Sequence, residues 1–107
     1  MGHFLHGGRV LVLIDEEKCV GFCAAKGVLD QWELYKIGVI SACRRRGGAQ
    51  MLLRKLEIEV QGTLFLEVRK TNHGAQKFYE NEGFKNVGER KGYYRNGESA
   101  MLYQKIV

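Results

Sequence analysis

Apolar residues form three runs of strand length in the first part of the chain. Residues 9–14 (RVLVLI) and 19–25 (CVGFCAA) flank the polar segment 15–18, and this pattern predicts an antiparallel hairpin. After a break at Asp30, residues 32–40 (WELYKIGVI) form the third predicted strand. No strand is predicted before the first of these runs.

The spacing of apolar residues changes to a helical period after Gly48. Apolar side chains recur at spacings of three and four residues, which puts them on one face of a helix that Gly62 is placed to end. A second helix is predicted from Asn72, a good N-cap residue, to Gly83. The residues expected to face the core are Ala49, Leu52, Leu53, Leu56 and Val60 in the first helix and Ala75, Phe78 and Tyr79 in the second.

Three further strands complete the expected order β-β-β-α-β-α-β-β. Residues 63–68 (TLFLEV) are almost continuously apolar, as in a strand covered on both faces. Residues 84–90 and 100–106 are predicted to be closing strands, with Asn96–Gly97 as a turn signal between them. The crossover between residues 33 and 68 requires two parallel neighbours, whereas the terminal hairpins are antiparallel. The prediction is an α/β fold with a mixed sheet and a single domain, residues 1–107.

Composition restricts the class of protein without defining its activity. The chain has 107 residues, 45% of them hydrophobic and 27% charged, which is typical of a globular protein. It has neither a membrane-length apolar run nor the pattern of a signal peptide, so we expect no membrane association and a cytoplasmic location. Cys19, Cys23 and Cys43 form no CxxC pair, so we expect reduced thiols packed as small apolar residues and no metal site. The net charge of +5 suits an anionic partner.

The segment Cys43–Gln50 (CRRRGGAQ) lies between the third predicted strand and the first helix. It can be interpreted as a basic patch for nucleic acid, as an ordinary surface turn, or as a phosphate cradle. A helix N-terminus offers unpaired N–H groups and partial positive charge, and Gly47 and Gly48 allow the backbone to approach a ligand closely. The arginines are not interleaved with aromatic residues, so we do not expect nucleic-acid binding.

Two other segments, together with this one, resemble the GNAT superfamily of acetyl-CoA-dependent N-acetyltransferases. The motif Arg44-x-x-Gly47-x-Ala49 is similar to the cofactor motif of the family, and residues 64–84 (LFLEVRKTNHGAQKFYENEGF) to its central signature. Residues 91–103 (KGYYRNGESAMLY) resemble the branch that acetylates protein N-termini, including ribosomal-protein alanine N-acetyltransferases. The resemblance implies a GNAT-like fold, acetyl-CoA as cofactor, and an α-amine of a protein or peptide N-terminus as acceptor.

The resemblance also implies roles for individual residues. Glu67 matches the general base, Tyr79 the general acid that protonates the departing thiolate, and Asn72 the asparagine that hydrogen-bonds the pantetheine arm. From the residues alone, a strand-end carboxylate is the favoured interpretation of Glu67 and a core aromatic that of Tyr79, and a plain N-cap is a fully adequate interpretation of Asn72. The remaining implied site residues are Ile37, Gly38 and Val39 for pantetheine, Arg44, Arg45, Arg46, Gly47, Gly48 and Ala49 for pyrophosphate, and Tyr93 and Tyr94 for the acceptor.

The chain departs from the family pattern at its N-terminus. The usual first strand and the two helices after it, which form part of the acceptor groove, have no counterpart expected in residues 1–8 (MGHFLHGG). An exposed sheet edge would then favour association, so we expect a homodimer. Two alternatives to an N-terminal acetyltransferase remain open: a relative that binds acyl-CoA with little or no activity, and an acetyltransferase of a small amine.

Overall fold

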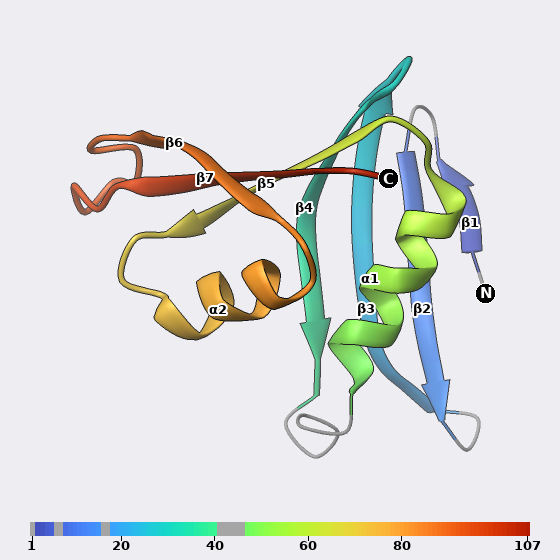
Figure 1. Cartoon of the computed structure of the whole chain (residues 1–107). Coiled ribbons are helices and arrows are strands. Elements are labelled where there is room, and N and C mark those ends of the chain that lie inside the picture. Colours follow the sequence, from blue (N-terminus) through green and yellow to red (C-terminus); the bar gives the residue numbers. More distant parts are fainter. Residues whose placement is uncertain (1, 6–7, 16–17, 41–46) are drawn as a thin grey trace.

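A computed structural model describes the backbone of residues 2–5, 8–15, 18–40 and 47–107, with side chains from residue 8 to 12, 20 to 40 and 47 to 107. Within this part of the chain, seven strands form one mixed sheet in the order β1-β2-β3-β4-β5-β7-β6 (Figure 1). The strands are β1 (Gly2–Leu5), β2 (Gly8–Asp15), β3 (Lys18–Val28), β4 (Gln31–Val39), β5 (Thr63–Arg69), β6 (Lys85–Arg90) and β7 (Ala100–Ile106).

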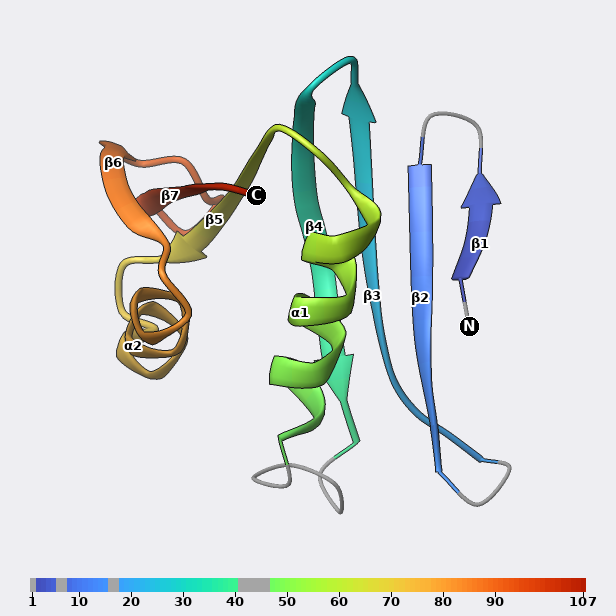
Figure 2. The same cartoon turned by 45° about the vertical axis from the view of Figure 1, so that its right-hand side comes forward.

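Two helices connect the central strands and lie on the same side of the sheet (Figure 2). Helix α1 (Gly48–Glu59) links β4 to β5, and α2 (His73–Asn81) links β5 to β6. Strands β4 and β5 are parallel, while the other strand pairs are antiparallel. The predicted crossover and the mixed sheet are therefore confirmed.

The core lies between this face of the sheet and the two helices. Leu52, Leu53 and Leu56 project from α1 and are at most 3% exposed, as their helical spacing predicts. Cys23 of β3 is fully buried among them, in agreement with its expected use as a small apolar residue. The other buried members of this core are Leu11, Ala25, Leu34, Val60, Leu64, Leu66, Val68, Tyr79, Phe84 and Tyr103.

The helix and strand boundaries follow the local signals in the sequence. Asn72 caps α2 as predicted, because its side-chain Oδ1 accepts a hydrogen bond of 3.1 Å from the backbone N–H of Ala75. Gly83 follows the helix with φ +94°, a conformation that favours glycine. The closing hairpin has its strands within one residue of the predicted bounds, with Gly97 at φ +86° in the turn.

The expectation that no strand precedes residue 9 is wrong. Gly2–Leu5 forms β1, which pairs antiparallel with β2 from Gly2 opposite Leu11 to Leu5 opposite Gly8. A four-residue segment is too short to show a period, and its strand conformation depends on the hydrogen-bonding edge that β2 offers it. The edge expected at β2 is consequently covered, and β1 is the outer strand.

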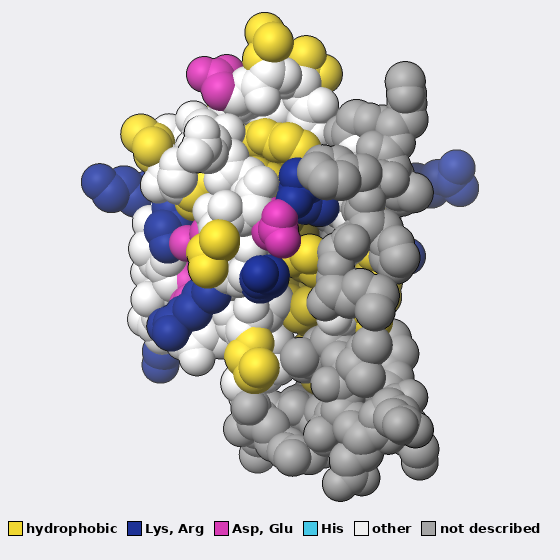
Figure 3. All heavy atoms as spheres, turned by 90° about the vertical axis from the view of Figure 1, so that its right-hand side faces the viewer, with side chains coloured by type: hydrophobic (Ala, Val, Ile, Leu, Met, Phe, Trp, Pro, Cys, Tyr) yellow, Lys and Arg dark blue, Asp and Glu magenta, His cyan; other side chains and the backbone are white. Residues whose placement is uncertain are grey.

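The surface on the α1 side of the molecule carries apolar and basic side chains next to each other (Figure 3). Met51 and Ile58 of α1 are 58% and 76% exposed there. In the part of the chain that the structure describes, neither helix has the length and apolar character needed to cross a membrane.

Candidate functional site

The sheet opens between β4 and β5. These strands pair only at Gln31, Trp32 and Glu33, opposite Thr63, Leu64 and Phe65. Beyond Glu33, β4 continues beside β3 while β5 continues beside β7, and the two strands diverge (Figure 1). The remainder of β4 thus has a partner strand on one side only.

A β-bulge in the β3–β4 ladder accompanies this divergence. The register runs from Ala24 opposite Lys36 to Ala25 opposite Leu34, so Tyr35 is an extra residue in β4. A bulge of this kind bends its strand and increases the local twist. The extra residue lies two positions after Glu33, the last residue that β4 pairs with β5.

The predicted pantetheine residues lie on the open part of β4. The Ile40 N–H donates to the Val20 carbonyl at 2.8 Å, and hydrogen bonding alternates along an antiparallel ladder. This alternation directs the backbone groups of Gly38 toward β3 and those of Ile37 and Val39 toward the open side. An extended ligand can bind there as an added strand.

A pocket of about 440 Å³ lies at the end of this open edge, where α1 begins. Gly47 has φ +78°, and a Cβ built on it would meet no atom of the described residues beyond its chain neighbours within 4 Å. The first α1 backbone bond goes from the Met51 N–H to the Gly47 carbonyl, and no described side chain caps the helix. The N–H groups of Gly48, Ala49 and Gln50 therefore precede the intrahelical ladder, an arrangement suited to anionic oxygens.

The three predicted arginines of this loop, Arg44, Arg45 and Arg46, lie outside the described residues. The walls of the pocket come from β4, the start of α1 and the end of α2. They are formed by Val39, Gly47, Gly48, Ala49, Gln50, Phe78, Asn81 and Glu82.

Tyr79 lies between α2 and the sheet. It is 7% exposed and makes edge-on ring contacts with Phe78 and Phe84, at centroid distances of 5.1 and 5.6 Å. Burial, with a smaller contribution from Cys23, raises the pKa of Tyr79 to about 12, so its hydroxyl keeps its proton at neutral pH. Tyr79 belongs to the core cluster against which Ile37 and Val39, in the open part of β4, are packed.

Glu67 occupies the other face of the sheet. Leu66 and Val68 of β5 are buried on the helix side, and the alternation of side chains along a strand turns Glu67 the opposite way. Glu67 lines a hollow of about 360 Å³ with Glu33, Phe65, Val87 and Arg90, among others. The two predicted catalytic residues are thus on opposite faces of the sheet, on either side of the opening between β4 and β5.

Tyr93 and Tyr94, the predicted acceptor residues, lie next to Glu67. The charge of the Glu67 carboxylate and its hydrogen bond with Tyr93 raise the pKa of Tyr93. Burial is the main cause of the raised pKa of Tyr94, and the charge of Glu67 adds to it. The two tyrosine rings are in edge-on contact at 5.1 Å, and the Arg69 guanidinium lies 3.8 Å from the Tyr94 ring centre. The fold therefore brings together three residues that are up to 27 positions apart in the sequence.

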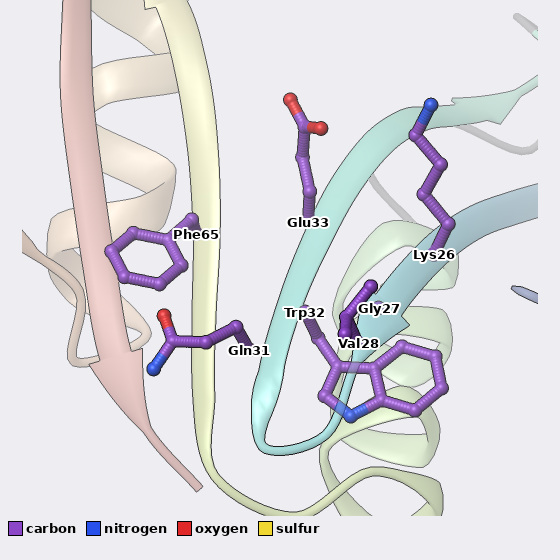
Figure 4. Close-up of a pocket in the computed structure, with 7 residues that line it drawn as sticks. All are labelled: Lys26, Gly27, Val28, Gln31, Trp32, Glu33 and Phe65. Carbon is purple, nitrogen blue, oxygen red and sulfur yellow. The ribbon is translucent and has the colours of Figure 1, made fainter. Parts of the chain in front are cut away.

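Sequence reasoning missed Glu33. Its side chain shares a face with Phe65, its partner in the parallel ladder, and with Glu67 two residues further along β5. Its charge also contributes to the raised pKa of Tyr93. Glu33 and Phe65 line a second hollow of about 440 Å³ as well, together with Lys26, Gln31 and Trp32 (Figure 4). Glu33 could be identified as a neighbour of Glu67 only from the pairing of Glu33 with Phe65, which the sequence does not specify.

Comparison with known proteins identifies relatives of this chain. Residues 3–84 match the acetyltransferase (GNAT) family. A [ribosomal protein bS18]-alanine N-acetyltransferase of Salmonella typhimurium is 39% identical over 88 residues, which are 78% of this chain and 60% of that protein. The corresponding protein of Haemophilus ducreyi is 34% identical over 84 residues, 75% of this chain and 58% of that protein. The chain thus spans about three fifths of the length of these curated relatives.

Solved structures show the same fold. The ribosomal-protein-S18-alanine N-acetyltransferase of Escherichia coli superimposes with a TM-score of 0.82 at 31% identity, covering 94% of this chain and 68% of that one. An aminoglycoside 6'-N-acetyltransferase complexed with coenzyme A has a TM-score of 0.79 at 22% identity, covering 94% and 73%. On the family match, which extends over most of its length, the chain belongs to the acetyltransferase (GNAT) family.

Proposed function

We propose that the protein transfers an acetyl group from acetyl-CoA to the α-amine of a protein or peptide N-terminus. The observation that carries this proposal is the open edge of β4, which runs from the pocket at the α1 N-terminus to the region between Tyr79 and Glu67. The names of the relatives at 34% and 39% identity support the acceptor class. The ribosomal-protein acceptors in those names also support a cytoplasmic location.

The residues present fit coenzyme A. Among the described residues nothing fills the space beside Gly47, the first α1 amides precede the helical ladder, and the edge groups of Ile37 suit a ligand with amides of its own. When bound, acetyl-CoA supplies an activated acetyl thioester. Asn72 is assigned to pantetheine by the family resemblance; its Oδ1 already caps α2, so its side-chain NH₂ is the group left to donate.

Glu67 is proposed to accept the proton that the acceptor ammonium must lose. A free α-amine has a pKa of about 7.7–8.0, so most of it is protonated at neutral pH and cannot attack a carbonyl carbon. The carboxylate takes this proton directly or through a water molecule. Tyr93 and Tyr94, the rings beside Glu67, are proposed to form the adjoining wall for the acceptor.

Tyr79, on the helix side of the sheet, is proposed to donate a proton to the departing thiolate of coenzyme A. As the new C–N bond forms and the C–S bond breaks, the leaving thiolate needs a proton, and the Tyr79 hydroxyl is protonated and next to the open edge. Holding the amine and the thioester together across the opening supplies a further part of the rate.

The test is acetyl-CoA turnover on a panel of N-terminal peptides and small amines, with Glu67→Gln and Tyr79→Phe beside the parent protein. We expect both substitutions to lower kcat by about 10²–10⁴-fold, the usual contribution of a positioned acid or base. Matched controls are Glu89→Gln, an exposed carboxylate paired with Lys70, and Tyr35→Phe, an exposed ring on β4. Undiminished turnover in both site variants would exclude these roles.

Two alternatives are separated by the same panel. Coenzyme A binding without turnover of any acceptor identifies a binding protein, an alternative consistent with a chain that spans only three fifths of its curated relatives. Turnover confined to small amines identifies a different acceptor class within the same fold.

A further inference from the structure

The end of α2 is joined to α1 by one carboxylate. Glu82 follows α2 directly, and its side chain is only 7% exposed. One oxygen, Oε2, accepts a hydrogen bond of 2.8 Å from Gln50 Nε2, and the other, Oε1, accepts one of 3.2 Å from Arg54 Nε. Both donors belong to the first two turns of α1, so Glu82 contacts α1 at two points one turn apart.

Lys105 of β7 adds an indirect connection between the same two helices. Its ammonium donates to the backbone carbonyl of Glu82 at 2.7 Å and to Glu57 Oε1 of α1 at 2.7 Å. The side chain of Lys105 is 27% exposed, so this contact is partly shielded from solvent. Glu82 is therefore held through its side chain and through its backbone.

The position of these contacts makes them relevant to the cofactor. Pairing between β4 and β5 stops at Glu33, so beyond that point backbone hydrogen bonds do not set the distance between the helices that follow the two strands. Glu82 and Gln50 line the pocket at the α1 N-terminus, on the walls contributed by α2 and α1. We propose that Glu82 is a positioning residue that fixes the width of this pocket; the proposal rests on coenzyme A binding there, as in the proposed function.

Two effects of Glu82 on an anionic ligand have opposite signs. Its negative charge repels phosphate oxygens, although the neighbouring Arg54 guanidinium offsets part of that charge. Its contacts hold the N–H groups of α1 and the end of α2 at a fixed separation, which favours binding because less ordering is needed. Glu82→Gln removes the charge but keeps an oxygen that can accept from α1, whereas Glu82→Ala removes both.

The two substitutions therefore separate positioning from simple electrostatics. If positioning dominates, Glu82→Ala weakens coenzyme A binding by about tenfold, an effect typical of contacts within one network, while Glu82→Gln binds at least as tightly as the parent. If charge alone matters, both substitutions tighten binding. The matched control is Glu80→Ala, which removes a carboxylate of α2. The Glu80 carboxylate accepts a hydrogen bond of 2.8 Å from Tyr103 Oη of β7 and not one from α1.

The experiment is calorimetric titration of coenzyme A into the full chain and its variants, with thermal unfolding measured in parallel. The expected result is a tenfold loss for Glu82→Ala, none for Glu82→Gln or Glu80→Ala, and non-additive losses for Arg54→Ala combined with Glu82→Ala. If Glu82→Ala does not fold, Gln50→Ala removes the hydrogen bond to Glu82 Oε2 without any change of charge, and must by itself weaken binding. Parent-like coenzyme A affinity in Glu82→Ala, or in the variant that replaces it, overturns the role of Glu82 and leaves the proposed function intact. A parent protein that does not bind coenzyme A overturns both.

Discussion

Gly47 provides a sharp test of how the α1 N-terminus binds its ligand. Its φ of +78° lies in the left-handed region, and a Cβ added to it would meet no atom of the other described residues within 4 Å, its chain neighbours apart. A side chain at this position is therefore strained by the backbone and projects into open space at the pocket, without clashing with the protein. Once the effect of this strain on stability has been measured separately, the change in coenzyme A affinity of Gly47→Ala shows how closely the ligand approaches this residue.

The strain has a calculable size. A non-glycine residue in the left-handed region costs about 1–2 kcal/mol. Replacing glycine by alanine also restricts the unfolded chain, which recovers about 0.4–1 kcal/mol. The net loss is about 1 kcal/mol, which corresponds to a fall in Tm of about 4–8 °C for a domain near 100 residues.

Gly97 is the matched control, because it has φ +86° and equally open surroundings in the β6–β7 turn. Gly97→Ala should lower Tm by the same amount and leave coenzyme A affinity unchanged. Gly47→Ala should weaken binding by at least tenfold, about 1.4 kcal/mol, because the methyl group occupies the approach to the first α1 amides. Thermal unfolding and calorimetric titration measure both quantities.

Two results would refute this reasoning. The first is equal coenzyme A affinity for Gly47→Ala and Gly97→Ala, which would mean that the ligand does not approach Gly47. The second comes from the larger substitution: Gly47→Val should damage binding more than Arg45→Ala does. The reverse order would show that arginine side chains, rather than backbone N–H groups, provide the main contacts.

Three further predictions concern stability and assembly. Leu53→Ala, at a fully buried α1 position, should lower the free energy of unfolding by about 2–5 kcal/mol in denaturant titration, whereas Ile58→Ala on the exposed side of the same helix should change it little. Burial raises the pKa of Cys23 from 9.0 to about 11 and that of Tyr79 from 10.0 to about 12, so the contribution of each neutral side chain to stability is fully present below pH 9. As the pH rises, this stability should be lost between about pH 9 and 11 for Cys23 and between about pH 10 and 12 for Tyr79. In urea titrations across this range, Cys23→Ala should abolish the part of the loss that occurs at the lower pH. Light scattering at micromolar protein should give a dimer mass, because β1 is an outer strand, and a monomer mass would contradict this.

Local signals in the sequence predicted most of the fold because each depends on neighbouring residues. Leu52, Leu53 and Leu56 are buried as their spacing requires, and Asn72 and Gly83 bound α2 through cap geometry. The strand at Gly2–Leu5 was missed because its conformation depends on pairing with β2 and not on its own composition.

The site was less predictable because its key relations are non-local. Glu33 joins Glu67 on one face only through the three-residue register between β4 and β5. Gln50 and Glu82 are 32 positions apart, and nothing in the spacing of either residue indicates that they meet. Family resemblance suggested roles for Glu67, Tyr79 and Tyr93, but only the fold shows that Glu67 and Tyr93 are neighbours while Tyr79 is on the opposite face.

The acetyl donor is proposed to bind along the open edge of β4. Residue-resolved amide hydrogen exchange, measured with and without coenzyme A, tests this proposal directly. We expect slower exchange at the Ile37 amide on binding and little change at the Gly38 amide, which is directed toward β3. Tight binding of coenzyme A with unchanged exchange at the Ile37 amide would contradict this mode of binding.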